Sequence, residues 1–357
     1  MKQRRVSLAF LGRIEGLPIV GVLALEFALF ILTAPTVFTH PLIYMSFLQT
    51  VPPLLVLGLG LTLVITAGEI DLSFPAVVAL AGFVFAYVFK HWHSPWAPWA
   101  GAAGAIAAGA LVGWINGVLI AKIRVPSIMA TLAAQFFWYG FTILIAGGLQ
   151  LDIKAVEATP IHALLTGRLF GYIPAQALWA TALAVFLWFF LNRHKFGEAI
   201  MFIGDNPNVA QVMGIDVAAT KIRLFTLMGV IAAFAGLLLT IEINVFFPNQ
   251  GSGFMLPVMA AVFIGGTLIS GGLGSIVGTY FGSYVIGSLQ AGVVATGITS
   301  YWVQSVMGLI IIIAVVINVV LGDGRFEEMG IRLRRWFGGA PVRDSRKTAT
   351  PEQPPGR

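Results

Sequence analysis

Long uninterrupted apolar runs restrict what this chain can fold into more than any other feature. They are about 16 to 24 residues long, the length of helix that crosses roughly 30 Å of hydrocarbon. Hydrophobic residues make up 58% of the 357 residues and charged residues only 10%, whereas soluble domains carry about 25% charged residues. The sequence therefore predicts an all-α, polytopic helical membrane protein without a large soluble domain.

Ten apolar segments are expected to span the membrane, some as broken helices, so that both termini lie on the same side. The cytoplasmic side is favoured because it then holds 18 of the 21 lysines and arginines, and cytoplasmic loops are enriched in these residues. Residues 1–322 are expected to form the transmembrane domain, and residues 323–357 a basic, partly disordered cytoplasmic tail. The ten expected spans are residues 16–34, 51–66, 73–89, 97–121, 126–146, 176–191, 222–243, 255–269, 276–297 and 301–321.

The sequence lacks the residues that several kinds of chemistry require. The chain contains no cysteine, which excludes disulfides, thiolate catalysis and cysteine-ligated metals. It has no phosphate-binding loop of the G-x-x-x-x-G-K-[ST] type and no nucleophile–base constellation. His91 and His93 have no third ligand nearby, and an interfacial aromatic belt explains them better. We expect no catalytic residue, no metal and no cofactor on this chain.

A short polar segment, residues 204–217, lies between two apolar runs and is predicted to form a brief helix. Asp205 or Asn206 can cap its start, and Pro207 suits its first turn. Gly214 can end it. Its apolar face is too short to fill a core of its own, so a partner protein is the natural place to bury it; a solvated connecting loop is the alternative. The residues expected to make this contact are Gly204, Asp205, Asn206, Ala210, Val212, Met213, Gly214 and Ile215.

Glycine interrupts the apolar sequence at residues 68–73 and 265–275. Unwound backbone at membrane depth is tolerated only where protein or a water-filled cavity satisfies it, and charged groups there tend to mark function. Glu69, Asp71 and Ser73 are therefore expected to line a pathway or to pin the break beside it. The alternative is a turn at the membrane edge in which Asp71 or Ser73 only caps the next helix. The glycines assigned to the breaks are Gly68, Gly265, Gly266, Gly271, Gly272 and Gly274.

Other polar residues within apolar segments could hydrogen-bond a polar solute or could bond one another between helices. Glu242 has the same two alternatives. Small residues crowd residues 101–117, which favours close helix packing there. The full set of candidates for a translocation pathway is Glu69, Asp71, Ser73, Asn116, Gln135, Asn244 and Gln290.

Three blocks of the sequence resemble the permease subunits of bacterial ABC importers of the ribose/monosaccharide type, which are related more distantly to branched-chain amino acid permeases. Residues 68–73 resemble the family's G-G-I-D-L-S segment, with Glu69 in place of the commoner glycine. Residues 204–240 are similar to its cytoplasmic loop and following span. Residues 265–302 resemble its glycine-rich block, from which residues 268–269 depart.

The resemblance implies a permease subunit that imports a monosaccharide or related polyol across the bacterial inner membrane and is not itself an enzyme. It implies a homo- or heterodimer of permease chains in the lipid membrane, cytoplasmic ATP-binding subunits that carry ATP and Mg²⁺, and a periplasmic solute-binding protein. No nucleic-acid partner is expected, because lysine and arginine in a membrane protein indicate its orientation first. In such transporters a short cytoplasmic helix of the permease sits in a groove of each ATPase, a role that falls on residues 205–215. Closure of the ATPases would rock the permease between outward- and inward-facing states.

Two alternative functions stay open. The same architecture could carry a nucleoside or a branched-chain amino acid, although a neutral polar pathway favours a sugar. An ion-coupled secondary transporter could use Glu69, Asp71 and Glu242 as relays, but it leaves residues 204–217 without a role.

Overall fold

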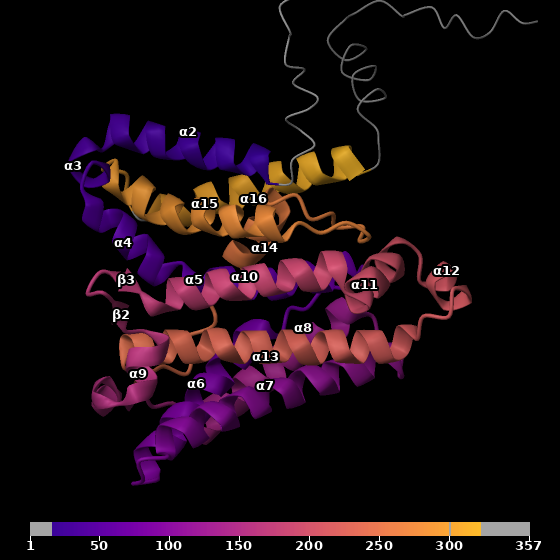
Figure 1. Ribbon diagram of the computed structural model, residues 1–357, viewed down its shortest axis with the longest axis horizontal. Helices are drawn as coiled ribbons and strands as arrows, with labels where there is room; N and C mark the ends of the chain where they lie inside the picture. The colour runs from indigo at the N-terminus through magenta and orange to yellow at the C-terminus, as the bar shows by residue number, and fades with distance from the viewer. Residues whose placement is uncertain (1–15, 300, 323–357) are drawn as a thin grey trace, which may run out of the picture. The chain divides into compact units, whose positions relative to one another are not determined.

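A computed structural model of the chain (Figure 1) describes residues 16–299 and 301–322. The chain divides into two units, residues 1–318 and 319–357. The described part of the first unit consists of α-helices and two small two-stranded sheets. The tail expected at residues 323–357 lies outside the described residues.

The described helices and strands extend over residues 17–322. In chain order they are α2 Leu17–Thr33, α3 Pro35–Phe38, α4 Pro41–Thr50, α5 Pro52–Thr66, α6 Phe74–His91, α7 Ala97–Ala121, α8 Ser127–Ile145, β1 Leu151–Asp152, the 3-10 helix η1 Lys154–Ala158, α9 Pro160–Leu165, β2 Arg168–Leu169, β3 Ile173–Pro174, α10 Ala175–Arg193, α11 Lys195–Asp205, α12 Pro207–Val212, α13 Val217–Ile243, β4 Val245–Phe246, α14 Met255–Ile264, α15 Ile276–Ala295 and α16 Tyr301–Gly322.

The prediction of an all-helical membrane protein is confirmed in its main feature. Within the described residues, α6, α7, α8, α10 and α13 are long and apolar enough to cross a membrane, and α4 with α5 makes a sixth candidate span that is bent by 48°. A helix overlaps each of the ten expected spans, but α2 and α14 have only 17 and 10 residues, whereas a crossing takes about 20. The number ten and the location of the termini stay predictions.

Helix α5 is the most enclosed element of the unit, because all 15 of its residues are buried. It packs against α10, α13, α14 and α15. Its two threonine hydroxyls bond back to carbonyls one turn earlier, from Thr62 to Gly58 (2.9 Å) and from Thr66 to Thr62 (2.6 Å). A helix that is apolar all round and satisfies its own hydroxyls in this way can be surrounded by protein on every side.

Helices α7 and α13 approach each other closely because glycines line their contact. A Cβ atom added at Gly113 would overlap the backbone oxygen of Phe225, and one added at Gly229 would overlap that of Gly109. Small residues at a helix interface let two backbones come this near. The close packing predicted for residues 101–117 is confirmed.

The elements form two distinct ends, which Figure 1 shows on opposite sides. At one, called the α12 end, lie α12 and the ends of α5, α7 and α11. At the other, called the α9 end, strand β1 pairs antiparallel with β4, and β2 pairs antiparallel with β3. The pairing of Leu151 with Phe246 ties the segment after α8 to the end of α13.

Two glycine substitutions, one inside the contact between α7 and α13 and one outside it, are predicted to change the free energy of unfolding in opposite directions. Gly113→Ala places a methyl group against the Phe225 carbonyl and should lower the free energy of unfolding by about 1–3 kcal/mol, as overpacking does. Gly140→Ala, in α8 with nothing within 4 Å of the added methyl, should raise it by up to about 1 kcal/mol, since alanine is the better helix former. Thermal unfolding of both variants in detergent measures this. Equal shifts would mean that the glycine contact does not limit stability.

Candidate functional site

The two glycine-rich segments predicted to break helices are non-helical connections between successive helices, here still called the breaks, and both lie at the α12 end. Whether each interrupts a span or turns at the membrane edge stays a prediction. One separates α5 from α6 at residues 67–73, and the other separates α14 from α15 at residues 265–275. Glycine is required where φ is positive, because a Cβ atom is disfavoured there. Among the six predicted break glycines this holds for Gly68 (74°), Gly266 (90°), Gly271 (86°) and Gly272 (80°).

The other two break glycines are required by close contacts instead. A Cβ atom at Gly265 would lie 2.6 Å from the carbonyl carbon of Gly278, and one at Gly274 would overlap the Thr66 hydroxyl. Both contacts hold the second break against a neighbouring helix.

A buried chain of hydrogen bonds holds the first break. The Asp71 carboxylate accepts from the backbone N–H of Ser73 (2.7 Å) and from its hydroxyl (2.6 Å), and the Asn116 amide of α7 donates to the same hydroxyl (2.8 Å). All three side chains are buried. Burial raises the pKa of the Asp71 carboxyl, which lies in the loop between α5 and α6, and the two hydrogen bonds from Ser73 oppose this rise. Three of the pathway candidates therefore form one connected group.

Helix α8 supplies hydrogen-bond partners for the unwound backbone of this break and for the first turn of α6. Three polar side chains spaced four residues apart face it from one side of the helix. The bonds run from the backbone N–H of Ile70 to Ser127 Oγ (3.2 Å), from that of Leu72 to Thr131 Oγ1 (3.0 Å) and from that of Ala76 to Gln135 Oε1 (2.9 Å). Only Gln135 was predicted from the sequence, although the spacing of Ser127, Thr131 and Gln135 was a signal for the whole row.

Glu69 forms an ion pair with Lys221 of α13. The side chains are 12% and 18% exposed respectively, so the pair is largely withdrawn from water. It lines a cavity of about 590 Å³ together with Arg124, Asn208 and Gln211. The cavity therefore connects the first break with the segment that carries α12.

The helix predicted within residues 204–217 is present as α12. Its N-cap is Asn206, whose side-chain oxygen accepts from the backbone N–H groups of Asn208 (3.0 Å) and Val209 (3.2 Å). Pro207 opens the first turn. The helix ends before Gly214, which has a φ of 86°. The capping and termination predicted for this segment are confirmed.

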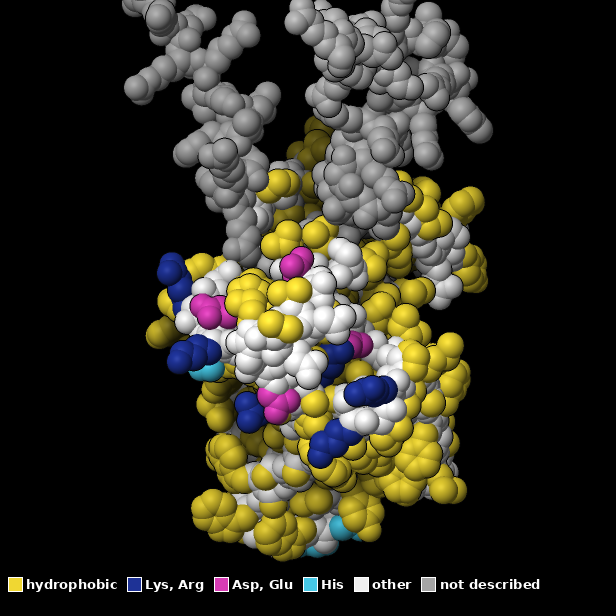
Figure 2. Space-filling model, turned by 90° about the vertical axis from the view of Figure 1, so that its right-hand side faces the viewer, with side chains coloured by type: hydrophobic (Ala, Val, Ile, Leu, Met, Phe, Trp, Pro, Cys, Tyr) yellow, Lys and Arg dark blue, Asp and Glu magenta, His cyan; other side chains and the backbone are white. Residues whose placement is uncertain are grey.

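Helix α12 presents an apolar row to its surroundings. Val209 is 51% exposed, Val212 89% and Met213 59%. Figure 2 looks onto this end, where lysines, arginines and carboxylates gather on the surface. Ala210, predicted to make the partner contact, is fully buried instead, because it lies on the inner side of the short helix. The exposed row, and not Ala210, is therefore accessible from outside the chain.

Two of the seven pathway candidates lie elsewhere. Asn244 follows α13 at the α9 end with a φ of 59°, and its amide donates to Glu157 (2.6 Å). Gln290 is exposed on α15. The structure thus gathers Asp71, Ser73, Asn116 and Gln135, places Glu69 beside them, and separates the other two.

A polar cluster at the α9 end was not predicted as a unit. The Gln49 side chain donates to Glu242 and accepts from Arg168 (3.3 Å), and its backbone oxygen accepts from Gln176. These residues come from α4, α13, β2 and α10. Glu242, a relay in the ion-coupled alternative, thus has an amide partner on α4.

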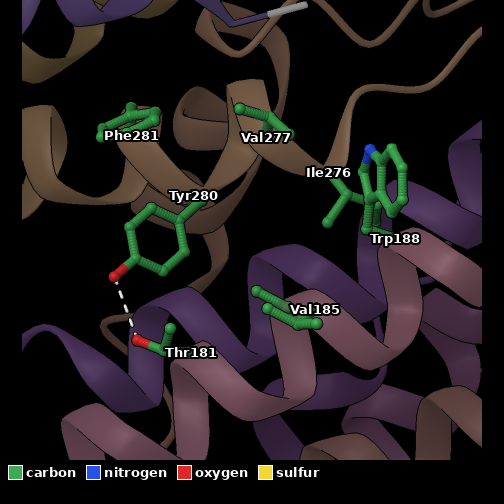
Figure 3. Close-up of a pocket in the computed structure, with 8 residues that line it drawn as sticks. Thr181, Val185, Trp188, Ile276, Val277, Tyr280 and Phe281 are labelled. Atoms are coloured by element: carbon green, nitrogen blue, oxygen red, sulfur yellow. Dashed lines mark hydrogen bonds between the residues drawn. The ribbon is translucent and has the colours of Figure 1, made fainter.

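A second cavity, between α10 and α15, contains none of the predicted site residues. Its lining is mainly apolar, and Figure 3 shows the hydroxyls of Thr181 and Tyr280 pointing toward each other, joined by a hydrogen bond of 3.0 Å. It offers no charged side chain to a solute.

Comparison with known proteins gives one family and a consistent set of relatives. Residues 43–315 match the protein family described as the branched-chain amino acid transport system / permease component. The chain is 34% identical to the ribose import permease protein RbsC of Bacillus subtilis (strain 168), over 79% of this chain and 86% of that one. It is 31% identical to RbsC of Escherichia coli (strain K12), over 74% and 81%, and 30% identical to the fructose import permease protein FrcC of Rhizobium meliloti, over 76% of each. The comparison with solved structures finds no match.

The Glu69–Lys221 pair predicts a strong coupling between two substitutions. Lys221→Met leaves the Glu69 carboxylate largely buried without its cation, which should cost more than the roughly 1 kcal/mol of an exposed pair and approach the roughly 3–5 kcal/mol of a buried one. Glu69→Gln with Lys221→Met should recover most of this loss. A double-mutant cycle of thermal unfolding measures the coupling. Additive effects would show that the pair contributes nothing to stability.

Proposed function

Because this chain belongs to the family of branched-chain amino acid transport system permease components, we propose that it is the membrane subunit of an ABC importer for a monosaccharide or related polyol. The chain is a multi-pass protein of the inner membrane and a transport component rather than an enzyme. Its similarity to two ribose permeases and a fructose permease supports a sugar as the solute.

The exposed apolar row of α12 carries the proposal for how this subunit works. A short helix that is capped at both ends, yet shows Val209, Val212 and Met213 to its surroundings, needs a partner to bury that row. We assign the α12 end to the cytoplasm, where cytoplasmic ATP-binding subunits would receive α12. These partner subunits would hold ATP and Mg²⁺. A second permease chain and a periplasmic solute-binding protein complete the proposed assembly.

The first break gives the chain a place to change conformation. Backbone N–H groups of the break and of the first turn of α6 donate to Ser127, Thr131 and Gln135 of α8, so α6 and α8 are expected to move together when the break shifts. Movement of α12 would then alternate access to the solute between the two sides of the membrane. Two states biased by ligands at separate sites are sufficient for such coupling.

Uptake into proteoliposomes tests the function. The chain is reconstituted with its proposed partner ATPase and solute-binding protein, and uptake of labelled ribose, fructose, a polyol, a nucleoside and leucine is measured with and without ATP. ATP-dependent uptake of a sugar or polyol is expected. Uptake of leucine or the nucleoside instead would replace the proposed solute, and uptake by the permease alone, driven by an ion gradient, would refute the importer.

Substitution on α12 tests docking separately. Val212→Glu puts a charge on the most exposed residue of the row and should reduce capture of the ATPase at least tenfold, without unfolding the chain. Phe170→Glu is the matched control, because Phe170 is 88% exposed and lies at the α9 end. Capture by affinity pull-down from detergent gives the result, and equal capture by the two variants would contradict docking through α12.

A further inference from the structure

Three glycines from distant parts of the sequence meet at the α12 end. They are Gly68 of the first break, Gly271 of the second break and Gly204, the second-last residue of α11. A Cβ atom added at Gly271 would lie 2.8 Å from the Gly204 oxygen and 2.9 Å from the Gly68 Cα, and one added at Gly68 would lie 3.6 Å from the Gly204 Cα. No side chain separates the three backbones.

Backbone contacts on either side reinforce this meeting point. The N–H of Gly272 donates to the Thr66 oxygen at the end of α5 (2.9 Å). A Cβ atom at Gly204 would overlap that same oxygen. Contacts between main chains offer no flexible side chain that could absorb a displacement, and close-packed atoms transmit strain.

The position of Gly204 in the chain connects this meeting point to the docking segment. Asp205 ends α11, and Asn206 caps α12, so the segment proposed to dock on the ATPase begins one residue after Gly204. Any rotation of α12 therefore acts on a backbone already in contact with both helix breaks.

We propose that Gly68, Gly204 and Gly271 form a coupling junction, through which movement of the docking segment repositions both helix breaks together. The three are positioning residues, and the inference rests on the proposed function. The first break leads into α6 and its bonds to α8, while the second leads into α15, which packs against α2 and α5. A single displacement at the junction would therefore act on α6 and α8 through the first break and on α15 through the second.

A pair of glycine substitutions within one break provides the test. Gly271→Ala inserts a methyl group between the three backbones. Gly266→Ala is the matched control, since its φ of 90° brings the same backbone strain as the 86° of Gly271, and an added Cβ atom meets nothing within 4 Å. We measure solute transported per ATP hydrolysed in complexes normalised for captured ATPase. The ratio should fall at least tenfold in Gly271→Ala relative to Gly266→Ala, and an equal ratio in the two would overturn the junction.

A reversible cross-link tests the same proposal without inserting a methyl group between the backbones. An added Cβ atom at Gly272 would lie 3.5 Å from the Cβ of Asp205, which fits a disulfide, and the chain has no other cysteine. If the docking segment and the second break move as one body, oxidised Asp205→Cys/Gly272→Cys should transport within twofold of its reduced form. Arrest on oxidation that a reductant reverses would overturn the proposal.

The same measurements separate this inference from the proposed function. Absence of ATP-dependent transport in the unsubstituted complex would refute the importer itself. Normal transport there, with an unchanged ratio in Gly271→Ala, would refute the junction alone. Failure of both the Gly271→Ala and the double-cysteine chains to assemble, while Gly266→Ala assembles, would show that the junction only maintains the fold, and would also overturn the proposal.

Discussion

The need of buried backbone for hydrogen-bond partners governs the α12 end of this protein. Helices satisfy their own backbone groups, but an unwound segment in an apolar surrounding must find partners elsewhere. The break between α5 and α6 finds them in the polar row of α8 and in its own Asp71. The break between α14 and α15 finds one in the end of α5, through Thr66. Each interruption of a helix therefore requires neighbouring segments that place hydrogen-bonding groups opposite the unwound backbone.

Glycine has two different structural roles in this fold. Between α7 and α13 it lets two regular helices approach until the backbone of one touches that of the other. At the breaks it permits positive φ angles at Gly68, Gly266, Gly271 and Gly272. The two uses coincide at Gly68 and Gly271, where the chain both turns and meets Gly204. A family resemblance based on glycine spacing thus reflects contacts between segments as well as turns.

Local signals in the sequence were sufficient for features formed by neighbouring residues. Asn206, Pro207 and Gly214 specify where α12 starts and stops because capping depends on residues a few positions apart. Partners far apart along the chain could not be found in this way. The pairing of Glu69 with Lys221 and of Gln49 with Glu242 spans more than 150 residues, and no local pattern encodes such distances. Helical spacing places Val209, Val212 and Met213 on one face, and the burial of Ala210 was missed because the partner contact was predicted for the whole segment rather than for that face alone.

The sequence by itself determined that the chain is a helical membrane protein with two glycine-dependent breaks and a short capped helix between apolar runs. These features follow from hydropathy and local backbone preferences, which act within one segment. Only the tertiary structure decided which segments meet: it gathered Asp71, Ser73, Asn116 and Gln135, sent Asn244 to the other end, and brought Gly204 against both breaks. The reason is that contacts between segments depend on how whole helices pack, and packing is decided by the complementary shapes of their surfaces rather than by the composition of either one.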